Sequence, residues 1–187
     1  MSKKTSLFQT RVLTEIAVLA ALSGVLYAIR PWTNPFGGSI TLGSMVPVMW
    51  LSLRRGVFAG FVAAVIYGLL ALLIDVTFLG PSAVIASVPQ AIMEYPVAFG
   101  MIGLTGMFRN KTVFFAVVGS GIAVFIRFLI HYTIGVLVWW YVYPFPVEYG
   151  RYLWPLVYNG SFLLPEYIIS AVILSILVKR GLLNYGL

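Results

Sequence analysis

Several polar side chains of this sequence stand inside apolar stretches, where a charge is costly. Glu94 follows Gln90 by four residues, and Tyr95 comes directly after it. A charged group near the centre of a bilayer costs roughly 2.5–3.5 kcal/mol on insertion scales, so it needs a partner or a purpose. His131 and Asn159 stand in later apolar stretches, and we expect them at a comparable depth. Together these side chains predict a pocket with an anion, amide groups, an imidazole and aromatic faces.

The chemistry of such a pocket suits a small, flat and partly cationic molecule. A carboxylate accepts paired hydrogen bonds from an amino-substituted heterocycle, and aromatic faces hold flat rings and cations. Catalysis has less support, because the chain has no cysteine, one histidine and no serine–histidine–carboxylate set. A glycine-rich phosphate loop for ATP hydrolysis is also missing from the sequence. We therefore expect no catalytic residues, no metal site and no cofactor.

Two further buried charges leave their roles open. Arg127 precedes His131 by one helical turn, and Glu166 follows Asn159 by about two turns. Both must face the interior of a helix bundle, because an unpaired charge in lipid is very costly. One interpretation is an internal ion pair of Arg127 with Glu94 or Glu166 that only fixes helix packing. The other is a role in the pocket.

Composition indicates that membrane helices position these residues. The chain is 61% hydrophobic and 9% charged, with a mean hydropathy of +1.00, whereas soluble domains carry roughly 25% charged residues. We predict an all-α fold: an integral membrane bundle of six transmembrane helices in a single domain, residues 1–187. The first apolar stretch is long enough to be a retained helix rather than a cleaved signal peptide. The expected spans are 12–29, 40–53, 57–74, 82–108, 113–143 and 155–178.

The basic residues predict the orientation of these spans. Nine lie at one set of ends and loops: Lys3, Lys4, Arg11, Arg54, Arg55, Arg109, Lys111, Lys179 and Arg180. The opposite set has only Arg30 and Arg151, together with Asp75 and Glu148. Because basic residues concentrate on the cytoplasmic side, both termini are expected to be cytoplasmic, in the cell (plasma) membrane. This also explains the formal charge of +7 without nucleic acid as a partner.

Small residues give the first span a smooth face. Ala17 and Ala21 are four residues apart, and Ala20 and Gly24 lie nearby. Small residues at this spacing let helices approach closely in lipid. The spacing leaves two possibilities open, which are packing inside this bundle and docking onto a partner membrane protein.

Five segments, in order, resemble the substrate-binding S components of energy-coupling factor vitamin transporters, most closely the thiamine-specific family. They are Leu13-Thr-Glu-Ile-Ala17-x-x-x-Ala21, Leu51-Ser-Leu-Arg-Arg-Gly56, Gln90-Ala-x-x-Glu94-Tyr95-x-x-Ala98, His131-x-x-x-Gly135-x-x-x-Trp139 and Asn159-Gly160. Each motif is weak alone, but together they cover every expected helix except the third.

The resemblance implies that the chain is a thiamine-binding subunit for vitamin uptake and not an enzyme. In this interpretation, Glu94 binds the aminopyrimidine or balances the thiazolium charge, and the aromatic residues stack. The implied contact residues are Gln90, Glu94, Tyr95, His131, Gly135, Trp139, Trp154 and Asn159. The resemblance also implies that the face with Ala17, Ala20, Ala21 and Gly24 docks on a transmembrane coupling subunit. Two cytoplasmic ATPases would then drive reorientation of the chain in the bilayer.

Departures from the family pattern leave the exact ligand open. The first outer loop reads Phe36-Gly37-Gly38-Ser39 where the family has a tryptophan, and Trp154 stands in place of a family tyrosine. Pro96, Pro165 and Glu166 are also unusual. The alternatives are therefore an S component for another small vitamin, a thiamine precursor or phosphate ester as ligand, and, less in keeping with the residues, an intramembrane enzyme or channel.

Overall fold

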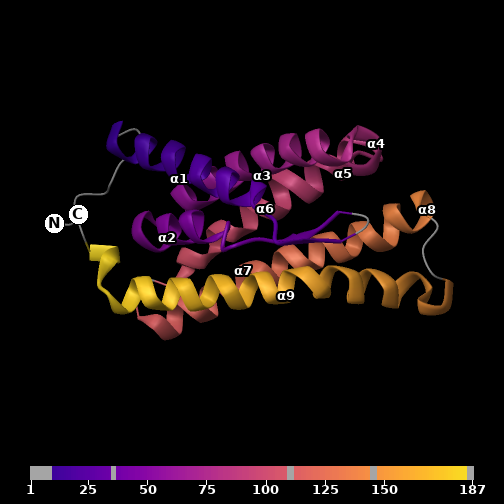
Figure 1. Cartoon of the computed structure of the whole chain (residues 1–187). Coiled ribbons are helices and arrows are strands. Elements are labelled where there is room, and N and C mark those ends of the chain that lie inside the picture. The colour runs from indigo at the N-terminus through magenta and orange to yellow at the C-terminus, as the bar shows by residue number, and fades with distance from the viewer. Residues whose placement is uncertain (1–9, 35–36, 109–111, 144–146, 185–187) are drawn as a thin grey trace.

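The structure is a computed structural model that describes residues 10–34, 37–108, 112–143 and 147–184. In this part of the chain, helices surround one short β-hairpin (Figure 1). Of the basic residues used to predict the topology, Lys3, Lys4, Arg109 and Lys111 lie outside the described residues, as does Phe36 in the first outer loop.

Four helices within the described residues are long and apolar enough to cross a membrane. The shortest, α1 (Thr10–Ala28), has 19 residues, or roughly 28 Å at 1.5 Å per residue, close to the ~30 Å hydrocarbon core. The predicted spans 12–29, 57–74, 113–143 and 155–178 each coincide with one of these helices. The other three are α3 (Val57–Leu79), α9 (Gly150–Lys179) and the run of α7 (Val113–Ile134), η3 (Gly135–Trp139) and α8 (Trp140–Val142).

The beginning of α1 and the end of α9 lie at the same end of the bundle (Figure 1). Basic residues gather at this end. Arg55 pairs with Glu15 in α1 at 2.6 Å, Arg54 approaches the same carboxylate at 3.8 Å, and Arg11 lies 3.5 Å from it. Lys179 closes α9. An even number of crossings would place both ends of the chain in this way.

The second predicted span, residues 40–53, is not one long helix. The strands β1 (Trp32–Thr33) and β2 (Ser39–Ile40) form an antiparallel hairpin, and α2 (Val46–Arg55) begins only after it. With 10 residues, α2 is roughly 15 Å long, about half the hydrocarbon thickness. The glycines and prolines before it favour a turn and thus shorten the helix.

The fourth predicted span, residues 82–108, is helical but broken into several geometries. After α4 (Pro81–Val84), the run continues through α5 (Val88–Ile92), the π-helix η1 (Met93–Val97), α6 (Ala98–Gly100) and the 3₁₀-helix η2 (Met101–Met107). Ser87 caps α5 by accepting a hydrogen bond from the amide of Gln90. Pro96 lies within η1 and has no amide hydrogen, so the regular α-helical ladder is interrupted there.

The third span is longer than predicted, and this changes the position of Asp75. The sequence placed Asp75 in an outer loop, but α3 continues to Leu79 and Asp75 is 4% exposed within it. The prediction that Asp75 lies in a loop was wrong, because the predicted span was ended just before this charged residue although the helix continues beyond it. Instead, this carboxylate is paired inside the fold, as described below.

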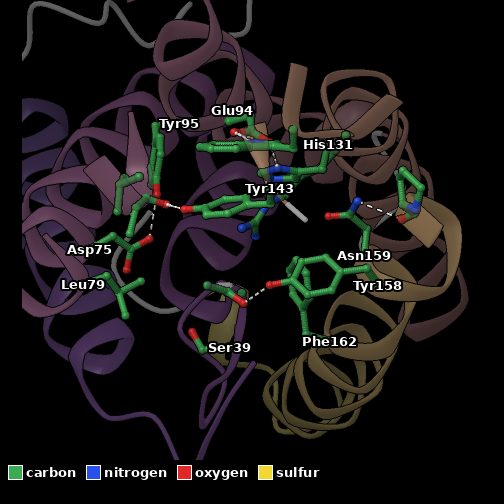
Figure 2. Close-up of a pocket in the computed structure, with 18 of the residues that line it drawn as sticks. Ser39, Asp75, Leu79, Glu94, Tyr95, His131, Tyr143, Tyr158, Asn159 and Phe162 are labelled. Carbon is green, nitrogen blue, oxygen red and sulfur yellow. Dashed lines mark hydrogen bonds and ion pairs between the residues drawn. The ribbon is translucent and has the colours of Figure 1, made fainter. Parts of the chain in front are cut away.

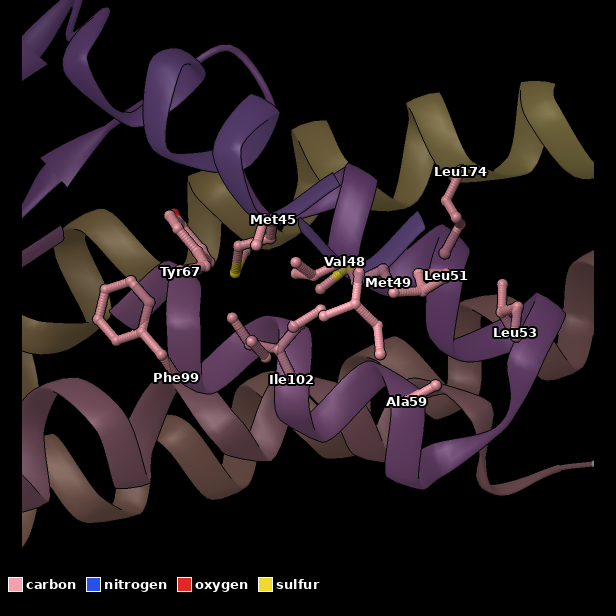
Figure 3. Packing of buried hydrophobic residues seen from close by; sticks show 14 of the residues in the cluster. Met45, Val48, Met49, Leu51, Leu53, Ala59, Tyr67, Phe99, Ile102 and Leu174 are labelled. Atoms are coloured by element: carbon pink, nitrogen blue, oxygen red, sulfur yellow. The ribbon is translucent and has the colours of Figure 1, made fainter. Parts of the chain in front are cut away.

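The core lies around α2, which is enclosed by α3, η2 and α9. Met45, Met49 and Leu51 are fully buried in one cluster with Tyr67 of α3 and Ile102 of η2, and Leu51 lies on the side of Leu174 of α9 (Figure 3). Close packing at one point depends on Gly106, because a Cβ atom there would lie 2.2 Å from the carbonyl oxygen of Ser52. The half-length helix is thus shielded by protein, and the cavity forms beyond its N-terminal end.

Candidate substrate-binding cavity

A cavity lies toward the end of the bundle where α1 ends and α9 begins, since its lining includes Tyr27 of α1 and Trp154 of α9. Figure 2 shows residues that line it. It has about 860 Å³ of atom-free space, which includes open solvent at its mouth. Seven of the eight predicted contact residues line it, and the eighth, Gln90, is buried behind Glu94. The seven are Glu94, Tyr95, His131, Gly135, Trp139, Trp154 and Asn159.

Glu94 is the anionic group on one wall of the cavity and is 8% exposed. Its carboxylate accepts hydrogen bonds from Gln90 Nε2 and from Trp139 Nε1 at 2.8 Å, and His131 Nδ1 lies 3.4 Å away. Such donors offset the cost of burying a charge. Since a carboxylate has about four acceptor positions, the three protein donors leave one for a ligand.

Two π-helical segments bring Glu94 and Trp139 together. Glu94 and Tyr95 belong to η1, whereas Gly135 and Trp139 are the first and last residues of η3. A π-turn holds one residue more than an α-turn and redirects the side chains that follow, which is why such segments occur often at functional sites. The hydrogen bond from Trp139 to Glu94 joins the two segments.

His131 connects Glu94 to Arg127. Arg127 Nε donates to His131 Nε2 at 3.4 Å, which assigns the ring proton to Nδ1 on the side of Glu94. The guanidinium of Arg127 lies 3.8 Å from the centre of the Phe99 ring and contacts Met45. Among the described residues, Arg127 forms no ion pair with either glutamate. The hypothesis of an Arg127–glutamate packing pair is therefore wrong.

Aromatic rings make much of the remaining wall of the cavity. Trp139 and Tyr143 stack with their centres 5.3 Å apart and an angle of 18° between their planes. Trp154 packs against Tyr158 at 5.9 Å, and Tyr158 meets Phe162 edge to face. Of these five residues, the sequence predicted only Trp139 and Trp154. Tyr158 and Phe162 line the cavity because α9 presents them at helical spacing, whereas Tyr143 comes directly after α8.

Asn159 and Gly135 lie where α9 meets the run from α7 to α8. Asn159 Nδ2 donates to the carbonyl of Pro155 at 2.9 Å, and its amide oxygen points into the cavity (Figure 2). A Cβ atom on Gly135 would lie 2.7 Å from Cβ of Pro155. Gly135 thus permits the close approach of the two helices, while Asn159 offers an acceptor to a ligand.

Asp75 is a polar residue of the cavity that the sequence analysis missed. It accepts hydrogen bonds from Tyr27 at 2.9 Å and from Tyr95 at 2.8 Å, and it pairs with Arg30 at 2.5 Å. These contacts join α1, α3 and η1 at one wall and orient the phenol of Tyr95 (Figure 2). The signal in the sequence was an aspartate at the end of an apolar run with Tyr27 and Arg30 at the end of another.

The β-hairpin between the first two long helices forms another wall of the cavity, although its residues were not among the implied contact residues. Gly37, Gly38 and Ser39 line it, and Tyr158 donates a hydrogen bond to the carbonyl of Gly37. Gly38 has a φ of 70°, and a Cβ atom there would lie 2.6 Å from the ring of Phe162. Glycine is needed because the backbone conformation is left-handed and the ring is close.

The small residues of α1 divide between two environments. Ala20 and Gly24 are buried, and a Cβ atom on Gly24 would lie 3.0 Å from Leu70 of α3. Ala17 and Ala21 are exposed. The prediction that all four form one docking face is therefore corrected: Ala20 and Gly24 pack inside the bundle, whereas Ala17 and Ala21 remain available to a partner.

Comparison with known proteins identifies the family. A model described as thiamine transporter protein matches residues 13–183. The chain belongs to this family. It is 30% identical over 178 residues to the thiamine transporter ThiT of Bacillus subtilis, with 88% of each chain covered. It is 28% identical over 182 residues to ThiT of Lacticaseibacillus paracasei, covering 91% of this chain and 88% of the relative.

Solved structures agree with this assignment. The structure of ThiT from Listeria monocytogenes matches with a TM-score of 0.73 at 31% identity, covering 91% of this chain and 94% of that one. The S component of a bacterial ECF transporter shares the fold, with a TM-score of 0.54 at 22% identity, covering 95% and 98% of the two chains. The predicted resemblance to the thiamine-specific transporter family is confirmed.

Proposed function

We propose that this protein is the membrane-embedded thiamine-binding subunit of an energy-coupling factor transporter. The single observation that carries the proposal is the cavity in which a buried carboxylate, Glu94, faces aromatic rings in a chain of the thiamine transporter family. Thiamine consists of two flat rings joined by a methylene group, a permanently cationic thiazolium and an aminopyrimidine, so it offers both a cation and a paired donor.

Glu94 supplies the interactions that distinguish such a ligand from a neutral one. Its remaining acceptor position suits the amino group of a heterocycle, and a charge-assisted hydrogen bond is about twice as strong as a neutral one. Its negative charge also offsets the thiazolium in a site where protein and lipid replace water. The amide oxygen of Asn159 provides a second acceptor on the α9 side.

The aromatic rings hold the flat parts of the ligand. Trp139 and Tyr143 present a stacked pair, and Trp154 and Tyr158 present a second pair on α9. A cation over an aromatic face gains about 0.5–2 kcal/mol, depending on how far water is excluded. The cavity is therefore suited to a cationic ring system.

The proposed topology has six crossings with both termini in the cytoplasm of the cell. The basic end of the bundle carries Arg11, Arg54, Arg55 and Lys179, and the cavity lies toward the opposite end. Because basic residues mark the cytoplasmic side, the cavity faces outward, where an uptake system meets its substrate. In this topology the hairpin and α2 together make the second crossing.

The proposed partners are a transmembrane coupling subunit and two ATPases. Ala17 and Ala21 are exposed on α1 and support docking of a helix at close distance. No catalytic role is assigned to this chain. Energy for transport would come from the ATPases through the coupling subunit.

The proposal is tested by tryptophan fluorescence of the purified protein in detergent, titrated with thiamine. Since Trp139 and Trp154 line the cavity, we expect saturable quenching by thiamine and a weaker response to its pyrimidine and thiazole halves. Thiamine monophosphate and another small vitamin serve as competitors. Quenching by a competitor but not by thiamine would reassign the ligand.

Replacing Trp139 by phenylalanine should weaken thiamine binding about tenfold, or ~1.4 kcal/mol. The ring remains for stacking, but the indole hydrogen bond to Glu94 is lost and the carboxylate becomes free to turn away from the ligand. Titration calorimetry measures the change. Trp50, which lies outside the cavity lining, gives the matched control W50F, for which the affinity should stay unchanged.

A further inference from the structure

Glu166 is a buried carboxylate that the proposed binding site does not use. It is 3% exposed on α9, lies outside the cavity lining and forms no ion pair among the described residues. Three hydrogen bonds converge on it instead. Thr41 donates through its amide at 2.5 Å and through its hydroxyl, and Ser44 donates at 3.1 Å. A buried charge needs such donors, because unpaired it would be costly.

These contacts attach Glu166 to the junction between the hairpin and α2. Thr41 directly follows β2, and its hydroxyl also accepts the amide of Ser44 at 3.0 Å. Ser44 continues the network to the hydroxyl of Tyr67 at 2.7 Å. Met45, at the start of α2, provides no side-chain cap, so the carboxylate of Glu166 supplies negative charge near this helix N-terminus.

One face of α9 contacts the hairpin at its turn and just after β2. Tyr158, Phe162 and Glu166 recur every four residues and therefore lie on the same side of the helix. Tyr158 bonds to the carbonyl of Gly37, and Phe162 packs on Gly38 (Figure 2). Of the three side chains, Glu166 is the most buried. It alone accepts a hydrogen bond from the backbone amide of Thr41, the residue that follows β2.

We propose that Glu166 is a positioning residue for the substrate. By fixing Thr41, it sets the position of the adjoining segment Gly37–Ser39, which forms one wall of the cavity. The part of this inference that concerns substrate rests on the proposed function. Loss of the anchor would let the hairpin move away from α9 and would open the cavity, although Glu166 itself touches no ligand.

The test compares E166A and E166Q with the wild type in two measurements. Amide hydrogen exchange in residues 37–44, read by mass spectrometry without ligand, reports the anchor directly. The dissociation constant and dissociation rate for thiamine show whether the segment Gly37–Ser39 still closes one wall of the cavity. We expect faster exchange in residues 37–44 and about tenfold weaker, faster-dissociating thiamine binding for E166A. E166Q should stay near the wild type in both, because its amide oxygen still accepts from Thr41.

The control is S52A, which removes one buried and one partly buried hydrogen bond between α2 and η2, far from the hairpin. It should alter neither measurement. Unchanged exchange in residues 37–44 of E166A, or a rise spread evenly over all helices, overturns the proposal. If E166A does not fold, T41V removes one of the same hydrogen bonds from the other side and carries the same expectations. Because the exchange measurement needs no ligand, it tests whether Glu166 holds residues 37–44 in place even if thiamine does not bind to the wild type.

Discussion

Replacing Glu94 by glutamine is expected to weaken thiamine binding about 100-fold, or ~2.7 kcal/mol. Glutamine preserves the size of the side chain and can still accept from Gln90 and Trp139, so the fold should persist. What is lost is the negative charge opposite the thiazolium and the charge-assisted hydrogen bond to the ligand. Calorimetric titration of the wild type and E94Q with thiamine measures the difference.

The matched control for this substitution is E148Q. Glu148 is exposed in η4 (Val147–Tyr149) and lies outside the cavity lining, so the same loss of charge should leave the affinity unchanged. A folded E94Q protein with the affinity of the wild type would show that Glu94 supports the fold rather than the ligand. The assignment of the anionic site would then move to Asp75, the other carboxylate on the cavity wall.

Replacing Asp75 by asparagine is expected to lower the free energy of unfolding by about 3 kcal/mol. Arg30 would lose its counter-charge while its side chain remains 9% exposed, and Tyr27 and Tyr95 would lose a charged acceptor. For a chain of this length, the loss corresponds to a fall in Tm of roughly 6–12 °C. Thermal unfolding of the ligand-free protein in detergent, followed by intrinsic fluorescence, measures it.

The double variant R30Q/D75N shows whether the stability lost in D75N comes from the unpaired charge of Arg30 or from altered packing. If the instability of D75N comes from a stranded cation, removing that cation should restore more than half of the lost stability. Additive losses from the two single variants would instead mean that Arg30 and Asp75 do not stabilise each other. Thiamine is absent from both measurements, so the outcome is independent of the proposed function.

Hydropathy predicted the four long helices because each is a run of apolar residues matched to bilayer thickness. It failed for residues 40–53, where the end of a β-strand and a 10-residue helix stand in place of one long helix, because a hydropathy window averages over both. The predicted helical nature of residues 82–108 was correct, but the π-helical geometry of η1 and η3 was not predicted. Pro96 marks the interruption in η1, whereas η3 contains no proline and hydropathy gives no sign of it.

Polar residues inside apolar stretches predicted Glu94, His131 and Asn159 as pocket residues, and the motifs of the resemblance added Trp139. The structure brings these four residues to one cavity. Asp75 was missed because a charge at the end of an apolar run is equally compatible with a loop. Likewise, small residues of one helix satisfy both close packing and docking, so spacing alone could not separate Ala20 from Ala17.

The hydrogen bonds between Thr41 and Glu166 span 125 residues of sequence. In a membrane, irregular backbone such as the hairpin is stable only where protein encloses it. Because α9 is synthesised after the other long helices, the contacts that enclose the hairpin can form only at the end of synthesis. Competence to bind a ligand arises with the last segment to enter the bilayer, so a prematurely ended chain would hold most of the helices and none of the completed site.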